Sequence, residues 1–384
     1  MKKIVFVVTS PYAVNAFLAS HIVSLSVHFQ IYLITNLKAS VLQESVYDHV
    51  TLIDVRIARE ISIVQDLIAL VVITKTLFKI RPDATHSLTP KAGLLAMLAA
   101  KITRVPFRFH TFTGQVWENM FGFRRFFFKS IDRLIVALTT EVFADSPSQC
   151  DFLQKSNVLG AKELSVLGPG SMTGVDINRF KYDEQARLFG RSMHDVKASA
   201  IIFLFVGRLN HDKGINDILN VFEKYGHKHS NWLLWLVGPD EGGFSDLIKS
   251  NSNSRKIRWF GQTPNPEQFM MAADILLLPS YREGFGSVII EAASCGVPAI
   301  GYKTHGVVDA IEPEVTGCLV DKGNIENFYL AMARLANDPE KRNNFANAAQ
   351  CRVKKRFSDK IVIKAWINFY LCRLVGGAQK LTRI

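Results

Sequence analysis

The feature that most constrains the fold is a recurring run of apolar residues without polar alternation. Each run is short and is bounded by turn residues, which is typical of strands buried on both faces of a parallel sheet. In the first half the runs lie at 4–8, 30–35, 50–55, 84–88, 107–112 and 141–146. Helix-like stretches such as KAGLLAMLAAKIT (91–103) separate them. The alternation predicts an α/β chain with a doubly wound sheet.

The same pattern starts again in the second half of the chain. Its apolar runs lie at 200–207, 232–238, 256–261, 274–280 and 297–302, with helical stretches between them. The segment 168–197 has no strong periodicity. A chain of 384 residues is also long for a single core. We therefore predict two Rossmann-like domains, 1–180 and 181–358, and a helical tail, 359–384, that packs back toward the first domain.

The charge balance points to an anionic partner. The chain has 46 Lys and Arg against 34 Asp and Glu, a net charge of +12. It has no zinc-finger spacing, basic zipper or RNA-binding aromatic signature, so we expect no nucleic acid. The window 101–133 holds seven basic residues against two acids and contains FGFRRFFF (121–128). This window is either a solvated face beside core aromatics or an edge that rests on an anionic membrane.

Cysteine usage and hydropathy indicate a cytoplasmic protein. The five cysteines are widely spaced and form no CxxC, which argues against a disulfide framework or a zinc site. The apolar run near the N-terminus, IVFVV, is too short for a signal peptide. Other apolar runs fall below the ~20 residues of a spanning helix. Any membrane contact is therefore expected to be peripheral.

The stretch SYREGFGSVIIEAASCG (280–296) reads as the end of a strand, a glycine-rich turn and a helix. The free backbone N–H groups at the start of the helix predict an anion site, and two carboxylates flank it as acceptors for sugar hydroxyls. The candidate donor-binding residues are Glu283, Gly284, Phe285, Gly286, Ser287, Val288 and Glu291. A helix with an acidic residue near its start, for dipole reasons alone, would also explain the pair of glutamates.

A second motif, FVGRLNHDKG (205–214), follows another buried strand. Gly207 permits a tight turn, and Arg208 and Lys213 can reach the carboxyl edge of the sheet, where phosphate oxygens would bind. A solvated basic loop is the plain alternative. Together the two motifs predict a diphosphate site. Since the chain contains no Asp-x-Asp, we expect two cations and a helix N-terminus to act in place of a metal.

These residues resemble the retaining glycosyltransferases of family 4. Besides the two motifs, LGPGSMTGVDINRF (167–180), LVGPDEGG (236–243), FGQT (260–263) and TGCLVDKGN (316–324) occur in the family's order. The resemblance implies the GT-B fold, two Rossmann-like domains that face each other across a cleft. It implies that Arg208 and Lys213 hold the donor diphosphate, that Glu283 faces the sugar and that Glu291 binds the ribose. Gly261 and Gln262 would border the base.

In the first half, the resemblance implies that His110, in RFHTFTGQVW, lies at a strand end near the reacting centre. A lone histidine is otherwise more often a satisfied core or surface residue. Thr113 and Gln115 follow it and are candidates for acceptor binding. Pro11 and Asn15 are further candidates, in a loop that departs from the Gly-Gly loop of many family members.

The expected function is retaining transfer of a hexose or N-acetylhexosamine from a nucleoside diphosphate sugar, with UDP as the expected nucleotide. The resemblance implies that no cofactor or metal takes part. It also suggests, as acceptor, a glycan on a polyprenyl diphosphate at the inner face of the cytoplasmic membrane, in surface polysaccharide (O-antigen or capsule) assembly. Two alternatives share the fold: a sugar-nucleotide 2-epimerase and a non-catalytic sugar-nucleotide-binding partner. The sequence identifies neither the sugar nor the base.

Overall fold

The computed structural model describes residues 1–58 and 62–376, and the chain divides into two compact units. The first unit comprises 1–174 together with the segment from Asp359 onward, and the second comprises 175–358. The sequence placed the first boundary six residues later, at 180. Residues 175–180 lie with the second unit because Val175 N donates to Phe357 O at 2.7 Å and Phe180 is buried in that unit's core.

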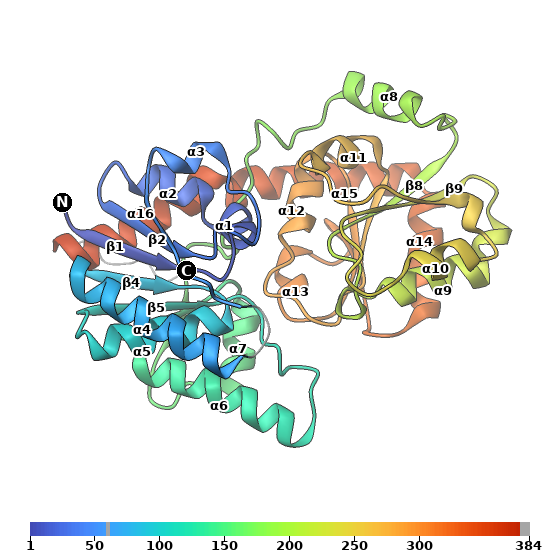
Figure 1. Cartoon of the computed structure of the whole chain (residues 1–384). Coiled ribbons are helices and arrows are strands. Elements are labelled where there is room, and N and C mark those ends of the chain that lie inside the picture. The colour runs from blue at the N-terminus through green and yellow to red at the C-terminus, as the bar shows by residue number, and fades with distance from the viewer. Residues whose placement is uncertain (59–61, 377–384) are drawn as a thin grey trace. The chain divides into compact units, whose positions relative to one another are not determined.

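The described residues of the first unit form a seven-stranded parallel sheet in the order β3-β2-β1-β4-β5-β6-β7 (Figure 1). The strands are β1 (Lys3–Val7), β2 (Gln30–Thr35), β3 (Thr51–Asp54), β4 (Ala84–Ser87), β5 (Phe107–Phe112), β6 (Glu141–Ala144) and β7 (Leu164–Val166). The chain runs outward from β1 to β3 and then crosses to β4 on the other side of β1. This reversal makes the β1–β4 pair the topological switch point of the unit.

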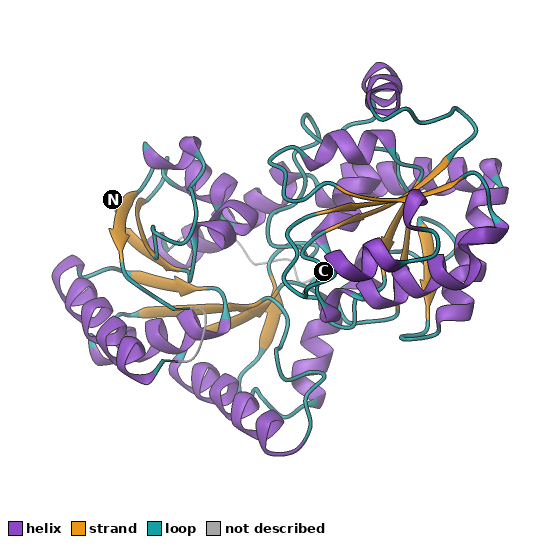
Figure 2. Cartoon of the chain, turned by 45° about the vertical axis from the view of Figure 1, so that its right-hand side comes forward, coloured by secondary structure: helices purple, strands orange, loops and turns teal. Residues whose placement is uncertain are grey.

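Helices cover both faces of this sheet (Figure 2). They are α1 (Pro11–Phe17), α2 (Ala19–Leu25), α3 (Glu44–Tyr47), α4 (Ile63–Ile80), α5 (Pro90–Ile102), α6 (Gly122–Leu138), α7 (Pro147–Lys155) and α16 (Asp359–Val375). The helix α5 is rich in small residues and largely buried, and it packs against both α4 and α6.

The C-terminal helix α16 completes the core of the first unit. It buries Trp366, Phe369 and Tyr370 among residues of β1, β5 and β6. The Trp366 ring stacks on His86, with ring centroids 5.1 Å apart and planes 11° apart. The Tyr370 hydroxyl is hydrogen-bonded to His86 Nδ1. Removing α16 would therefore expose a large aromatic surface.

The described residues of the second unit form a six-stranded parallel sheet in the order β10-β9-β8-β11-β12-β13. The strands are β8 (Ile201–Val206), β9 (Trp232–Val237), β10 (Ile257–Trp259), β11 (Ile275–Leu278), β12 (Ala299–Tyr302) and β13 (Gly317–Val320). Here the chain reverses between β10 and β11, so β8 and β11 are neighbours at the switch point.

The helices of the second unit also lie on both faces of its sheet (Figure 2). They are α8 (Glu184–Met193), α9 (Ile215–Tyr225), α10 (Ser245–Ser250), α11 (Pro266–Ala272), α12 (Ser287–Ser294), α13 (Val307–Ala310), α14 (Ile325–Asn337) and α15 (Pro339–Arg352). Short 3₁₀ turns occur at His211–Lys213, Gly226–Lys228 and Ser254–Lys256, and a π-helical turn occurs at Val353–Phe357.

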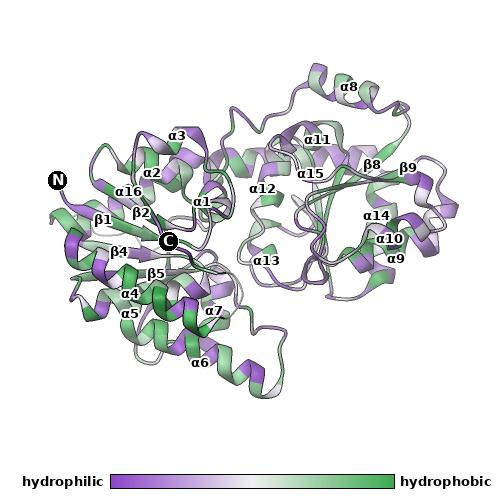
Figure 3. Cartoon of the chain, viewed as in Figure 1, coloured by the Kyte–Doolittle hydropathy of each residue, from purple (hydrophilic) through white to green (hydrophobic). Residues whose placement is uncertain are grey.

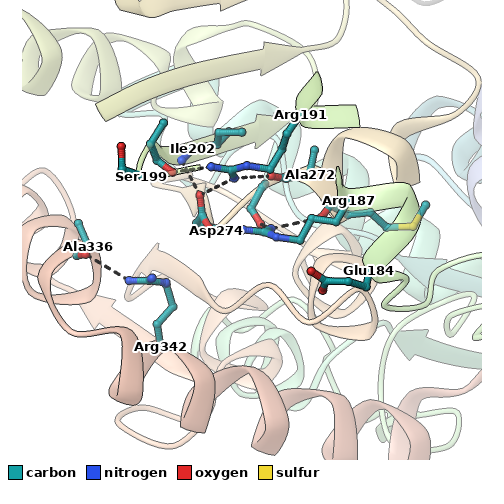
Figure 4. Close-up of polar contacts among 12 residues, drawn as sticks. Glu184, Arg187, Arg191, Ser199, Ile202, Ala272, Asp274, Ala336 and Arg342 are labelled. Carbon is teal, nitrogen blue, oxygen red and sulfur yellow. Dashed lines mark hydrogen bonds and ion pairs between the residues drawn. The ribbon is translucent and has the colours of Figure 1, made fainter. Parts of the chain in front are cut away.

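A buried carboxylate ties α8 to this sheet (Figure 4). Asp274, just before β11, accepts hydrogen bonds from Arg187 at 2.5 Å and from Arg191 at 3.1 Å. It also accepts one from the backbone N–H of Ile202 in β8 at 2.7 Å. The carboxylate thus links α8 to β8 at the amino ends of β8 and β11. This is the end of the strands opposite to the carboxyl edge.

The apolar runs predict eleven of these strands to within three residues at each end. The pattern misses β7 and β13, which are the last strands at one edge of each sheet. Both are short, LSV and GCLV, and neither contains more than three consecutive apolar residues.

Within the described residues, no helix is both long enough and apolar enough to cross a membrane.

Candidate active site

The candidate site is built on the two loops that follow the switch-point strands of the second unit, β8 and β11. In a doubly wound sheet, ligands bind beyond the carboxyl ends of such strands. The loop after β8 carries Arg208 and Lys213, and the loop after β11 carries Glu283 and the glycine-rich turn. The topology therefore brings together two motifs that are about 70 residues apart in the sequence.

Glycines allow these loops to approach one another closely. Gly214 has φ +72°, and a Cβ there would lie 2.0 Å from Pro279 O, at the end of β11. A Cβ at Gly238, after β9, would lie 1.9 Å from Gly207 O. A side chain at either position would force the contacting loops apart.

Lys213 and Glu283 form an ion pair through Nζ and Oε1. The Ser280 hydroxyl donates to the same carboxylate oxygen at 2.9 Å. The backbone N–H of Lys213 is bonded in turn to Asn210 Oδ1 at 3.1 Å, which closes a 3₁₀ turn and orients the lysine. One predicted cation and one predicted carboxylate are thus in direct contact.

Arg208 is paired with a carboxylate that the sequence did not single out. Its Nη1 lies 2.7 Å from Glu241 Oε2, and both side chains are about 30% exposed. Glu241 belongs to the loop after β9, the strand next to β8. The sequence offered a hint of Glu241, because LVGPDEGG also follows a strand. An acidic residue at this place does not by itself show which cation it pairs with.

The helix α12 begins where the sequence predicted. Gly286 precedes it with φ +83°, and the N–H groups of Ser287 and Val288 belong to its first turn, where no intrahelical acceptor exists. A Cβ at Gly306 would lie 2.3 Å from Gly284 O, so a second loop supports this turn from behind. Phe285 is buried against Phe357 and anchors the turn in the core.

Glu291 lies at the fifth position of α12 and is only partly exposed. Burial raises the pKa of its carboxyl to about 7, and the positive charge of Arg179 opposes this shift. Arg179 is itself paired with Glu267 at 2.8 Å. Burial therefore makes Glu291 hold a proton at a higher pH than an exposed glutamate does.

The predicted base-bordering loop joins the same edge. Gly261, with φ +68°, follows β10, and its carbonyl accepts a hydrogen bond from Gly238 N at 2.7 Å. Gln262 is exposed.

A buried polar cluster beneath the site was not foreseen from the sequence. Asp217 in α9 accepts from the hydroxyls of Tyr281 at 2.8 Å and Tyr302 at 2.7 Å. Burial, together with this hydrogen bond, raises the pKa of Tyr281 to about 12. Arg282 pairs with Asp212 at 2.7 Å, and Tyr281 N donates to Asp212 O at 2.7 Å. These contacts fix both loops around Glu283.

In the first unit, His110 does not lie at a strand end as expected. It pairs with Ser87 and Val142 inside the sheet, and β5 continues to Phe112. Its ring is 1% exposed, and Nδ1 is hydrogen-bonded to Ser87 Oγ at 2.8 Å. Burial lowers its pKa to about 3, so the imidazole is neutral. The strand has the bounds that the apolar run 107–112 predicted, so His110 lies two residues before its end.

The acceptor candidates also belong to the first unit. Pro11 opens α1, in the loop after β1. Both polar atoms of the Asn15 side chain are hydrogen-bonded, because Nδ2 donates to Val41 O and Oδ1 accepts from Gln43 N. Thr113 is partly buried, and Gln115 is buried with no partner for either polar atom among the described residues. Gln115 is therefore a buried member of this set with unused hydrogen-bonding capacity among the described residues.

Over residues 1–58 and 62–376, no group of three or more His, Cys, Asp or Glu side chains is placed to hold a metal ion.

Comparison with known proteins identifies relatives of this chain. Residues 191–352 match the family described as glycosyl transferases group 1. The capsular polysaccharide biosynthesis glycosyltransferase CapM of Staphylococcus aureus is 28% identical over 319 residues, 81% of this chain and 82% of that protein. The UDP-Gal:alpha-D-GlcNAc-diphosphoundecaprenol alpha-1,3-galactosyltransferase of Escherichia coli is 25% identical over 299 residues, 73% of each chain.

Among solved structures, the sucrose-phosphate synthase from Thermosynechococcus elongatus aligns with a TM-score of 0.82 at 18% identity. The alignment covers 98% of this chain and 100% of that one. This likeness confirms the fold class predicted from the sequence, the GT-B fold with its two Rossmann-like domains.

Proposed function

We propose that this chain, whose residues 191–352 match the glycosyl transferases of group 1, is a retaining enzyme that transfers a hexose or N-acetylhexosamine from a UDP-sugar to a lipid-linked glycan. The observation that carries the proposal is the convergence of Arg208, Lys213 and the start of α12 at the switch point of the second unit. This is the arrangement that a diphosphate requires.

The diphosphate would replace the carboxylates that neutralise these cations. Arg208 is held by Glu241 and Lys213 by Glu283. A diphosphate offers more negative charge and more acceptor oxygens than a single carboxylate. Charge-assisted hydrogen bonds contribute about 1.5–3 kcal/mol each, so two cations and a helix N-terminus could stabilise a departing diphosphate by about 4–8 kcal/mol. We propose that transfer proceeds without a metal ion on this basis.

The remaining donor contacts would come from the same carboxyl edge. Ionised Glu291 would accept hydrogen bonds from the ribose hydroxyls, and Gly261 and Gln262 would border the base. Glu283 would face the sugar and position it, while Gly284, Phe285 and Gly286 shape the turn. UDP is proposed as the nucleotide because a relative that aligns with 73% of this chain is named for a UDP-Gal donor.

Retention would follow from attack on the same face of the sugar that the diphosphate leaves. The bond between the anomeric carbon and the diphosphate breaks, and a bond to the acceptor oxygen forms. A phosphate oxygen takes the acceptor's proton, so UDP leaves as the other product. In this scheme Lys213 and Arg208 stabilise the negative charge that develops on the diphosphate.

The proposed acceptor is a glycan on a polyprenyl diphosphate, in assembly of a surface polysaccharide such as O-antigen or capsule. Two relatives support it, one named for capsule biosynthesis and one for a diphosphoundecaprenol acceptor. Neutral His110 is proposed to lie near the reacting centre, with Thr113, Gln115, Pro11 and Asn15 on the acceptor side. The protein would act in the cytoplasm, bound peripherally to the anionic inner face of the membrane.

The decisive experiment separates donor binding from transfer. Thermal shift with UDP and GDP should show stabilisation by UDP, and Lys213→Ala should abolish it, whereas Lys249→Ala on the exposed helix α10 should not. Product analysis with a lipid-linked acceptor should then show a glycoside of retained configuration. Turnover of donor without acceptor would indicate a 2-epimerase, and binding without any turnover would indicate a non-catalytic partner. Either result would reject the proposal.

A further inference from the structure

The helix α4 carries a stripe of large apolar side chains that face away from the first unit. Its buried residues are Ala69, Ile73 and Leu77, which form the inward face. Its exposed large apolar residues are Ile63, Val64, Leu67, Ile68, Val71, Val72 and Phe78. Leu67 and Val71 are 58% and 52% exposed. A helix on a sheet normally places polar residues on this side, so the stripe requires a partner.

A second exposed apolar cluster lies on α6. Phe121, Phe123, Phe126 and Phe127 are all exposed, and Phe123 is 79% exposed. The buried helix α5 lies between α4 and α6 and packs against both. Figure 3 shows hydrophobic residues along α4, and hydrophobic residues interspersed with hydrophilic ones along α6. The two helices therefore form two apolar ridges on one face of the unit, with axes on the order of 20 Å apart.

The topology places both apolar clusters at the same end of the unit. A helix that follows a parallel strand begins at the carboxyl edge of the sheet. The exposed apolar residues of α4 lie mainly in its first ten positions, 63–72, and those at α6 lie mainly at 121–127, with Leu134 further along the helix. The carboxyl edge is also where ligands bind in this fold. The apolar ends of α4 and α6 thus border the edge at which an acceptor would enter.

The charge of these helices selects the kind of partner. Together they carry six basic residues, Lys75, Lys79, Arg124, Arg125, Lys129 and Arg133, and two acids. Both acids are engaged, Asp66 with Lys91 at 2.9 Å and Asp132 with Trp117 Nε1 at 2.6 Å. Burial, with repulsion from Arg133 and Arg125, lowers the pKa of Lys129.

This combination argues against a second copy of the chain as the partner. A twofold dimer would bring the same surface against itself and oppose like charges. Exposed Phe, Leu, Ile and Val beside a positively charged helix are instead the features of a surface that enters the interface of an anionic lipid bilayer.

We propose that α4 and α6 together form the membrane-docking face, with α4 inserting its apolar stripe among the lipids and α6 supplying aromatic anchors and positive charge. The bilayer then lies beside the carboxyl edge of the first sheet, so a headgroup-level diphosphate acceptor would be presented to that edge. The docking itself rests on the proposed function only in that the acceptor is lipid-linked.

The test uses flotation of the full chain with phosphatidylglycerol vesicles and with phosphatidylcholine vesicles. The unchanged chain should bind phosphatidylglycerol vesicles in a salt-sensitive manner and phosphatidylcholine vesicles weakly. The α4 variant Val64→Ser, Leu67→Ser, Val71→Ser should bind phosphatidylglycerol at least tenfold less. The matched control Leu188→Ser, Phe189→Ser, Met193→Ser removes three exposed apolar residues from α8 and should bind as the unchanged chain does.

A second measurement covers the case in which the α4 variant does not fold. Leu67→Trp should gain fluorescence that brominated phosphatidylglycerol quenches, whereas Phe189→Trp should not. Wild-type binding by the α4 variant, or the same quenching at both positions, would overturn the proposal. A dimer in light scattering that the α4 variant converts to monomer, with vesicle binding unchanged, would overturn it in favour of a second copy.

The outcome is separable from that of the proposed function. Stabilisation by UDP and transfer to a water-soluble acceptor analogue do not require a membrane. Transfer without vesicle binding would reject the docking face alone. Vesicle binding by α4 and α6 without transfer would reject the proposed function alone.

Discussion

The two switch points of this protein have the same topology, but the loops at one carry charged side chains and the loop at the other carries none. In the second unit the loops after β8 and β11 carry Arg208, Lys213 and Glu283, and each cation has a carboxylate partner. In the first unit the loop after β1, TSPYAVN, has no charged residue. The strands beside it bury neutral histidines, His86 and His110. The topology decides where a ligand can bind, whereas the side chains on the loops decide which ligand it is.

The same contrast appears in how each unit is held together. The second unit fastens α8 with a buried carboxylate and two arginines. The first unit fastens α16 mainly with an uncharged aromatic and imidazole cluster, besides a partly exposed ion pair between Arg373 and Glu141. Loss of a buried charge should therefore destabilise the second unit, and gain of a buried charge by protonation should destabilise the first unit.

The largest effect is expected from Asp274→Ala in the second unit. The substitution leaves the buried Arg191 and partly buried Arg187 without their carboxylate, which should cost about 3–5 kcal/mol of unfolding free energy. Urea unfolding, with peptide-resolved hydrogen exchange in β8 and β11, would measure it. Asp246→Ala on α10, whose side chain is 93% exposed, is the control. An equal loss in both variants would remove the structural role of the Asp274 cluster.

Acid should destabilise the first unit by a comparable amount. Burial lowers the pKa of His21 to about 4 and of His110 to about 3, against about 6.5 in the unfolded chain. Below pH 6.5 these histidines bind protons in the unfolded state but not in the folded state. The free energy of unfolding therefore falls as the pH falls toward 3. From pH 7 to pH 5 the loss should be about 4 kcal/mol for the two histidines together.

This acid loss can be assigned with a matched pair of variants. His21→Asn should remove its own share of the loss, about 2 kcal/mol, in melting experiments between pH 7 and pH 5, while His86 and His110 keep theirs. His28→Asn, at an exposed position, should leave it unchanged. If hydrogen exchange showed the second unit opening first at pH 5, the contrast between the two units would be wrong.

Removal of either switch-point cation should reduce catalysis strongly. Lys213→Ala and Arg208→Ala should each lower kcat/KM by about 30–1,000-fold, or about 2–4 kcal/mol, because each removes a preorganised positive charge from the leaving diphosphate. Steady-state kinetics with Lys249→Ala as control would show this. Unchanged kcat/KM in both variants would remove their assigned role.

The partial burial of Glu291 should make donor binding depend on pH. Its pKa is about 7 without ligand, and the ribose hydroxyls require the ionised carboxylate as acceptor. Affinity for UDP-glucose, measured by calorimetry, should fall by up to about fivefold between pH 7 and pH 6, or about 1 kcal/mol. Glu291→Gln should bind more weakly at pH 8 and show no such dependence. A wild-type pH dependence in the variant would place the titrating group elsewhere.

The smallest expected effect is a gain. Glu241→Gln frees Arg208 from a partly exposed carboxylate, so KM for the donor should fall two- to fivefold, corresponding to no more than about 1 kcal/mol. High salt should shrink the difference. Glu340→Gln, on the exposed start of α15, is the control. A rise in KM would mean that Glu241 positions Arg208 rather than competes for it.

Much of the fold could be read from the sequence because the signal is local. A strand covered on both faces must be apolar along its length, so runs such as IIFLFV are recognisable without knowledge of their neighbours. The strands β7 and β13 escaped because the apolar runs in LSV and GCLV are too short to stand out from the surrounding sequence, although three of the four residues of β13 are buried. The run 107–112 gave β5 its observed bounds, whereas the expectation that His110 lies at a strand end came with the family resemblance and was wrong.

What the sequence by itself determined is the set of buried strands, the glycines that permit close loops, and the presence of cations and carboxylates after those strands. Only the tertiary structure decided that Lys213 meets Glu283, that Arg208 meets Glu241, and that the stripe on α4 faces outward. The physical reason is how far apart in the sequence the interacting residues lie. Burial of a strand is written into consecutive residues, whereas an ion pair or an exposed face depends on which distant segments the packed sheet brings together.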